Sequence, residues 1–351
     1  MKLFKNEGTK MGLDIGKRFI KGLCLSNGEQ GLSVDSYFIY ERKETENVQA
    51  AAVELDNFLK EMVTQCELAG AKVSASLSYN DFTSFELNVP QMPNADLEQI
   101  IENKLSEQVS YPISAASYAY LHVNQSQQET GNAGLYKVYS SEKDNLLELS
   151  KTLSNAKLEV VHLEPEPLSV AAALSCNELI DKESTHLVLD IGDSQITGFL
   201  IHKEKVLNVN HLSQTMHSIQ ETLMEKLDLT AEEAEMEKRN FSFDENYSGN
   251  EIVQSLFDDF YCSVFDEIKR IAKLYSLQLQ NQNIDSILIT GGGSGCSLIN
   301  EALESYCHLP CFIVDPFRKV DYSSPEINTE FFNANRHLMT TALGLALRGV
   351  A

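Results

Sequence analysis

Two copies of the tripeptide Asp-Ile-Gly, at residues 14–16 and 190–192, each end a short apolar run. A glycine at a strand end lets backbone N–H groups approach a ligand closely, which suits a phosphate chain. The carboxylates of Asp14 and Asp190 at the same strand ends suit a hydrated Mg²⁺ ion, held through water molecules. Two such turns that face each other could clamp a nucleoside triphosphate and its metal.

A glycine run follows a third apolar strand candidate in SILITGGGSGCSLINEAL, residues 286–303. Gly291, Gly292 and Gly293 precede Ser294 and an amphipathic helix, and a strand, a glycine turn and a helix N-terminus together form a ligand-binding edge. A glycine run alone is equally typical of a tight turn, so its weight comes from following the two Asp-Ile-Gly turns. The sequence contains no Walker A pattern.

The elements that must position these turns occur twice. MGLDIGKRFIKGLCL (11–25) aligns without gaps on LVLDIGDSQITGFLI (187–201), and each copy reads as strand, tight turn and strand. A third strand candidate follows in both copies, at 31–40 and 205–213, and then a helix, which the 3.6-residue period places at about 48–69 in the first copy. The pattern predicts a duplicated α/β domain with a ligand-binding cleft between the copies. Coincidence is the alternative, because three-residue matches are common.

The composition restricts the class of protein. A chain of 351 residues is too long for one ordinary core, and 28 Lys plus Arg against 51 Asp plus Glu give a net charge of −23, so we do not expect a nucleic-acid partner. The seven cysteines form no CxxC pair, which is typical of a reduced, cytoplasmic protein. Cys307, His308 and Cys311 would need a fourth metal ligand from elsewhere. We expect no membrane span, because no apolar run is long enough.

The order of the three motifs resembles the phosphate-1, phosphate-2 and adenosine motifs of the actin, Hsp70 and sugar kinase superfamily. Within that superfamily the chain resembles the type IV pilus assembly protein PilM family along almost its whole length. The resemblance is carried by short segments that occur in order, at 89–120 (VPQMPNADLEQIIENKLSEQVSYPISAASYAY), 160–174 (VVHLEPEPLSVAAAL), 227–240 (LDLTAEEAEMEKRN), 314–317 (VDPF) and 342–349 (ALGLALRG).

The resemblance implies a two-lobed, actin-like α/β fold, in which a ribonuclease H-like βββαβαβα unit is duplicated. It also implies an inserted, SHS2-like subdomain 1C, which the family shares with the division protein FtsA. The expected boundaries are 1–79, 162–184 and 333–351 for subdomain 1A, 80–161 for 1C, 185–230 and 285–332 for 2A, and 231–284 for the mostly helical 2B. Apolar periodicity predicts one long helix at 251–280, and we expect its aromatic residues Phe257, Phe260, Tyr261 and Phe265 in the core rather than in a binding stripe.

The resemblance further implies ATP and Mg²⁺ as cofactors. The expected phosphate and magnesium residues are Asp14, Gly16, Lys17, Arg18, Lys21, Asp190, Gly192, Asp193, Ser194 and Gln195, with Asp14 and Asp190 holding the metal through water. The expected adenosine residues are Glu235, Lys238, Gly291, Gly292, Gly293 and Ser294. A charged helix face with ordinary i,i+3 and i,i+4 pairs is the alternative interpretation of Glu235 and Lys238.

Two departures from the family pattern bear on the chemistry. Lys17, Arg18 and Phe19 stand where the family usually has small hydroxyl residues, and the segment 213–217 (SQTMH) replaces a Gly-Gly pair. Cations can still bind phosphate, but hydroxyl donors and a close backbone approach are lost. We therefore expect nucleotide binding with weak or absent hydrolysis.

The resemblance implies a cytoplasmic scaffold of the inner-membrane platform that assembles type IV pili. Such a scaffold binds the N-terminal cytoplasmic peptide of a PilN-like bitopic membrane protein, in a groove between 1A and 1C, and the pilus motor ATPase is a further candidate partner. Through these partners the protein would be peripheral to the inner membrane.

Two alternatives remain. A small-molecule kinase or ATPase of the same superfamily would need a base beside the phosphoryl acceptor, and Asp193 is the candidate near the second turn. An FtsA-like division protein would need a basic amphipathic membrane helix after a linker, and ALGLALRGVA at the end of the sequence does not read as one.

Overall fold

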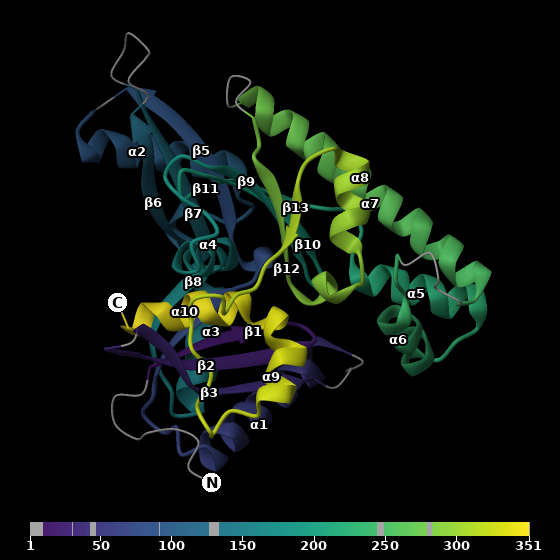
Figure 1. Ribbon diagram of the computed structural model, residues 1–351. Coiled ribbons are helices and arrows are strands. Elements are labelled where there is room, and N and C mark those ends of the chain that lie inside the picture. Colours follow the sequence, from purple (N-terminus) through teal and green to yellow (C-terminus); the bar gives the residue numbers. More distant parts are fainter. Residues whose placement is uncertain are drawn as a thin grey trace. The chain divides into compact units, whose positions relative to one another are not determined.

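Figure 1 shows the computed structural model, which describes residues 10–29, 31–42, 47–90, 92–125, 133–243, 249–278 and 283–350. The chain forms two compact units. The first contains Met1–Ala172, Val320–Ile327 and Thr341–Ala351, and the second contains Ala173–Lys319 and Asn328–Thr340.

The first unit is built on a five-stranded sheet in the order β3-β2-β1-β4-β8. Strands β1, β2 and β3 form an antiparallel meander, and β4 and β8 add parallel to β1. Their bounds are β1 (Lys10–Ile15), β2 (Phe19–Gly28), β3 (Gly31–Glu41), β4 (Lys72–Leu77) and β8 (Glu159–Pro165).

Helices α1 (Val48–Gln65) and α3 (Lys143–Asn155) share one hydrophobic core with this sheet, in which Leu59 and Leu153 are fully buried. Helix α1 begins where Asn47 accepts a hydrogen bond from the N–H of Ala50 at 2.9 Å, an N-cap. It ends at Gln65, four residues before the expected end. The chain turns away there because Glu67 has a left-handed backbone with φ 55°.

A smaller three-stranded antiparallel sheet, in the order β5-β7-β6, is inserted between β4 and α3. Its elements are β5 (Thr83–Pro90), α2 (Asn94–Gln108), β6 (Ala116–Gln125) and β7 (Ala133–Glu142). Helix α2 buries Leu97 and Ile101 against Val89 and Val138 of the sheet, which gives the insertion a core of its own.

The expected subdomain 1C contained helix α3 and the start of strand β8. In the structure, β8 is a strand of the five-stranded sheet, and α3 packs in the core beneath that sheet. Strand β8 pairs with β4 from Lys72↔Glu159 to Leu77↔Pro165, and α3 packs in the same core as α1. We therefore propose 83–142 as the extent of the inserted subdomain.

The second unit repeats the first sheet, with strands in the order β11-β10-β9-β12-β13. The bounds are β9 (Thr185–Ile191), β10 (Ile196–His202), β11 (Lys205–His211), β12 (Ser286–Thr290) and β13 (Cys311–Ile313). The helices assigned wholly to this unit are α5 (Met216–Leu227), α6 (Ala231–Asn240), α7 (Glu251–Gln278), α8 (Ile299–Cys307) and α9 (Thr329–Asn335). Two helices have residues in both units. Helix α4 (Glu166–Cys176) passes from the first unit to the second after Ala172, and only the first residue of α10 (Thr340–Val350) is assigned to the second unit.

The long helix expected at 251–280 is α7, which is drawn in green in Figure 1. Four of its aromatic residues are buried, as predicted for core side chains: Phe257, Phe260, Tyr261 and Phe265. No helix among the described residues is long and apolar enough to cross a membrane.

The duplication extends to single hydrogen bonds. In the first unit the N–H of Gly16 donates to the carbonyl of Phe19 at 2.9 Å, and in the second the N–H of Gly192 donates to the carbonyl of Gln195 at the same distance. The helix and strand order is βββαβαβα in both units once the inserted sheet and the α6–α7 segment are set aside. These matches confirm the predicted duplication of an α/β unit.

Candidate functional site

The first Asp-Ile-Gly turn carries an internal ion pair. Asp14 is buried, with 3% of its surface exposed, and its Oδ2 lies 2.5 Å from the Nζ of Lys21. Ser76 of β4 donates its hydroxyl to the other oxygen of Asp14 at 3.3 Å. Lys21 is the direct cross-strand partner of Asp14 in the β1–β2 hairpin. This register places an ammonium group beside the predicted magnesium carboxylate.

The other two predicted cations of this turn lie elsewhere. Arg18 forms an ion pair with Glu41 of β3 at 2.8 Å, and its guanidinium lies 5.2 Å from the ring centre of Phe19. Lys17 is exposed at the tip of the turn. Lys17 is therefore the most accessible of the three cations, while Arg18 and Lys21 both pair with carboxylates of the protein.

Arg42 supports the first turn, and the sequence analysis did not identify it. Its N–H donates to the carbonyl of Arg18 at 2.7 Å, and its Nη1 donates to the carbonyl of Gly16 at 3.4 Å. Its Nη2 donates to the carbonyl of Ala51 at 2.8 Å and its Nε to Glu54 at 2.9 Å, both in α1. Arg42 thus links the turn to α1, and only the β2–β3 register brings it there.

In the second unit the glycine run lies against the second Asp-Ile-Gly turn. Gly291 has φ +84°, and a Cβ built there would lie 2.3 Å from Oδ1 of Asp190 and 2.7 Å from the carbonyl oxygen of Ile191. A Cβ on Gly293 would lie 2.2 Å from Cγ2 of Ile191. No side chain fits in either place, so glycine is needed for the two segments to meet.

Ser294 closes the glycine turn on itself. Its side chain is buried, and its hydroxyl and N–H both donate to the carbonyl of Gly291, at 2.7 and 3.1 Å. The glycine run continues as a short 3-10 turn (Gly292–Gly295), and helix α8 begins at Ile299. The expected helix N-terminus directly after the glycines is therefore displaced, because the serine hydroxyl stabilises a tight turn instead.

Lys238 connects the predicted phosphate and adenosine residues of the second unit. Its Nζ lies 3.3 Å from Asp193, 3.1 Å from Glu235 and 3.0 Å from the amide oxygen of Gln220, and 4% of its side chain is exposed. Gln220, in α5, was not predicted from the sequence. The network ties α5 and α6 to the turn after β9.

The remaining predicted residues surround that turn. The carbonyl of Asp193 accepts the N–H of His217 in the first turn of α5 at 2.9 Å. Ser194 is exposed, and the amide Nε2 of Gln195 lies 3.5 Å from the carbonyl of Ile196. Asp193 is held by Lys238 and so is poorly placed to act as a base. Over the described ranges, no group of three or more His, Cys, Asp or Glu side chains is arranged to hold a metal directly.

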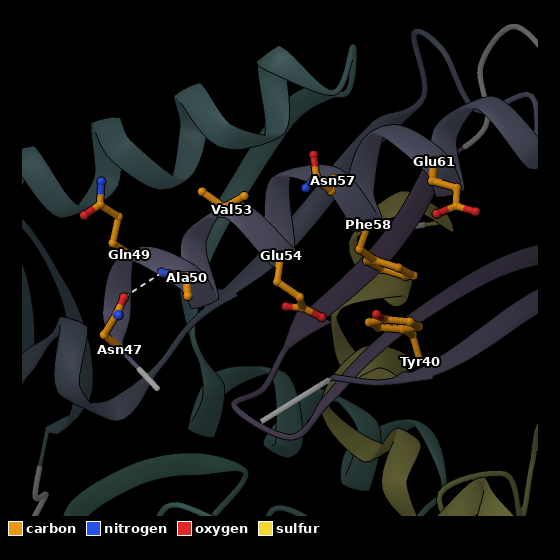
Figure 2. Close-up of a pocket in the computed structure, with 9 residues that line it drawn as sticks. All are labelled: Tyr40, Asn47, Gln49, Ala50, Val53, Glu54, Asn57, Phe58 and Glu61. Atoms are coloured by element: carbon orange, nitrogen blue, oxygen red, sulfur yellow. Dashed lines mark hydrogen bonds between the residues drawn. The ribbon is translucent and has the colours of Figure 1, made fainter. Parts of the chain in front are cut away.

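A surface pocket of about 700 Å³ lies beside α1 in the first unit, and sequence reasoning did not predict it. Figure 2 shows the rings of Tyr40 and Phe58 face to face, with the carboxylate of Glu54 directed toward the same space. The other residues that line it are Asn47, Gln49, Ala50, Val53, Asn57 and Glu61.

The sequence profile described as "Type IV pilus assembly protein PilM" matches residues 12–350. The chain belongs to this family. A comparison with curated protein sequences finds no significant match.

Solved structures show that this member of the PilM family has the actin-like fold. A structure titled "PilM-PilN type IV pilus biogenesis complex" is similar with a TM-score of 0.83 and 21% identity, over 98% of this chain and 99% of that chain. The ethanolamine utilization protein EutJ from Carboxydothermus hydrogenoformans matches with a TM-score of 0.50 and 15% identity, over 98% and 90%. MreB 5 of Spiroplasma citri bound to AMPPNP matches with 0.50 and 12%, over 98% and 96%.

Proposed function

We propose that the chain is an actin-like, ATP-binding scaffold of the type IV pilus assembly platform, and that it binds the N-terminal cytoplasmic peptide of a PilN-like membrane protein. The match of the PilM family profile over residues 12–350 carries this proposal. A solved structure of the same fold is described as the "PilM-PilN type IV pilus biogenesis complex". By this proposal the protein is cytoplasmic and reaches the inner membrane through its partner, and the pilus motor ATPase is a second candidate partner.

As residue assignments, the Asp-Ile-Gly turns are proposed for the phosphates of a nucleotide and the glycine run of the second unit for its adenosine. The close contact between Gly291 and Asp190, which only a glycine allows, supports this assignment because it brings the glycine run and the second Asp-Ile-Gly turn together. A structural neighbour, MreB 5, is bound to the ATP analogue AMPPNP. When bound, Mg²⁺ supplies charge neutralisation of the phosphates, and Asp14 and Asp190 would hold it through water.

Weak or absent hydrolysis follows from the pairing of the charged groups. A phosphoryl-transfer site needs a positioned base or an oriented water molecule and cations directed at the transferred phosphoryl group. Here Arg18 pairs with Glu41, Lys21 with Asp14, and Asp193 with Lys238. These contacts leave binding as the function that the residues support best, and they disfavour the kinase alternative.

The proposal is tested with a labelled peptide that corresponds to the cytoplasmic N-terminus of the PilN protein of the same organism. We expect fluorescence anisotropy to show binding that is tighter with Mg-ATP than without nucleotide, and ATP turnover near background. A peptide of the same composition in scrambled order is the control. Equal binding of both peptides, or steady ATP hydrolysis in the presence of a small-molecule acceptor, would contradict the scaffold function.

A further inference from the structure

The pocket beside α1 is formed by one face of that helix and the end of the edge strand β3. It runs from Asn47, the N-cap of α1, to Glu61 in the last half of the helix. Fourteen residues of helix correspond to about 21 Å. A site of that length suits an extended peptide segment of about six residues, at about 3.3 Å per residue, better than a single small ion.

The wall of the pocket is a stacked aromatic pair. The rings of Tyr40 and Phe58 have their centres 3.8 Å apart with an interplanar angle of 16°. Both side chains pack against the core of the first unit, so the pair is held in place from behind. Burial, and secondarily the neighbouring carboxylate of Glu54, raise the pKa of the Tyr40 hydroxyl, which therefore stays neutral.

Among the described residues, two charged side chains line the pocket, and both are acidic: Glu54 and Glu61. Oε2 of Glu54 accepts the hydrogen bond of Arg42 at 2.9 Å, and the hydroxyl of Tyr40 also forms a hydrogen bond with this carboxylate. Glu61 is exposed at one end. With Arg42 counted against Glu54, the described lining keeps one net negative charge, the exposed carboxylate of Glu61.

An aromatic face beside a carboxylate is the environment that a guanidinium group fits. Its planar cation stacks on an aromatic ring and donates in parallel to carboxylate oxygens, which the compact ammonium of lysine does less well. The side-chain amides of Asn47, Gln49 and Asn57 line the same pocket and offer donors and acceptors to a peptide backbone. The net charge of −23 attracts basic partners at long range.

We infer that this pocket binds an arginine-bearing segment of a partner protein, with the guanidinium group against the Tyr40–Phe58 pair and the exposed carboxylate of Glu61. The site lies on α1 and β3, and none of its described lining residues belongs to the inserted sheet. It is therefore a second docking site, separate from the groove proposed for the PilN-like peptide.

The test uses the full chain and a labelled hexapeptide, Gly-Ala-Arg-Ala-Arg-Ala, in buffer of about 0.15 M ionic strength, where long-range attraction is screened. The matched probe has citrulline in place of both arginines, which keeps the shape and removes the charge. We expect the citrulline peptide to bind at least tenfold more weakly. We expect Glu61→Gln and Phe58→Leu to weaken binding of the arginine peptide at least threefold, with the fold of both variants checked by circular dichroism.

Glu225→Gln is the control variant, because Glu225 is an exposed acidic residue of the second unit and its loss changes the net charge by the same amount. It should leave the affinity for the arginine peptide unchanged. Equal effects of Glu61→Gln and Glu225→Gln would show attraction to the overall charge and overturn the inference. Equal binding of the two peptides would overturn it, as would absence of binding at about 1 mM peptide.

Discussion

The ammonium group of Lys21 lies 2.5 Å from a carboxylate oxygen of Asp14, directly across the β1–β2 hairpin. In the second unit the residue across from Asp190 is Thr197, which carries no charge. The two duplicated turns therefore differ in electrostatics, since the first contains its own cation. A metal at the first turn must share Asp14 with Lys21 or displace that lysine, and a ligand phosphate must share Lys21 with Asp14.

Replacing Lys21 by Met should destabilise the protein by about 3 kcal/mol, because a buried carboxylate that loses its cation keeps its desolvation cost. Urea unfolding measures the change. The double variant Asp14→Asn/Lys21→Met should lose less than the single variant, since no charge is then left buried. A double variant as unstable as Lys21→Met alone would show that the ion pair is not the cause.

Gly291→Ala should cost about 3 kcal/mol or more of unfolding free energy, because the positive φ and the overlap with Asp190 both oppose a side chain. It should also weaken ATP binding, measured with a fluorescent ATP analogue. Gly28→Ala is the control: a Cβ at Gly28 meets nothing within 4 Å, so its effect should stay within about 0.5 kcal/mol. Similar behaviour of the two variants would refute the role assigned to Gly291.

Arg42→Met should loosen the first turn, because it removes the side-chain contacts to Gly16, Ala51 and Glu54. Amide hydrogen exchange at Gly16 should become faster, and affinity for the fluorescent ATP analogue should fall about threefold to tenfold, as expected for about 1 kcal/mol. Lys60→Met, which breaks an exposed ion pair with Asp56 in the same helix, should change neither measurement. Unchanged exchange at Gly16 would argue against a positioning role.

The buried Lys137 should make the free energy of unfolding depend on pH. It is 2% exposed in the inserted sheet, and burial lowers its pKa from 10.5 to about 8, against the opposing effect of Glu86. Below pH 8 both folded and unfolded chains carry the charge, and the folded state bears its full desolvation cost. Between about 8 and 10.5 the unfolded chain binds more protons at this group, so the contribution of Lys137 makes stability rise with pH.

Lys137→Met should therefore be more stable than the wild type at pH 7, by up to about 3 kcal/mol. The difference between the two proteins should shrink as the pH rises from 8 to 10.5. Thermal unfolding of both across this range measures it, with Lys151→Met as the exposed-lysine control. A constant difference over the range would rule out the titration of Lys137 as its origin.

Much of the fold could be predicted from local patterns. The two Asp-Ile-Gly turns, the strands beside them and the long helix α7 follow from apolar periodicity and from glycine positions, which act over a few residues. The extent of the inserted sheet was harder to predict, because α3 and β8 carry ordinary patterns. Strand β8 belongs to the five-stranded sheet because it pairs with β4, which lies more than 80 residues earlier in the sequence at the pair Lys72↔Glu159, and α3 packs against that sheet.

The candidate site likewise combines features that can be predicted from the sequence with features that depend on the tertiary structure. The amino-acid sequence alone determined which glycines and aspartates occupy the turns, because duplication and residue type can be read directly. Only the tertiary structure decided that Lys21 pairs with Asp14, that Lys238 joins Asp193 to Glu235, and that Arg42 holds the first turn. Ion pairs and hydrogen bonds require distances of about 3 Å. Strand register and helix packing set those distances between segments that are far apart in the chain.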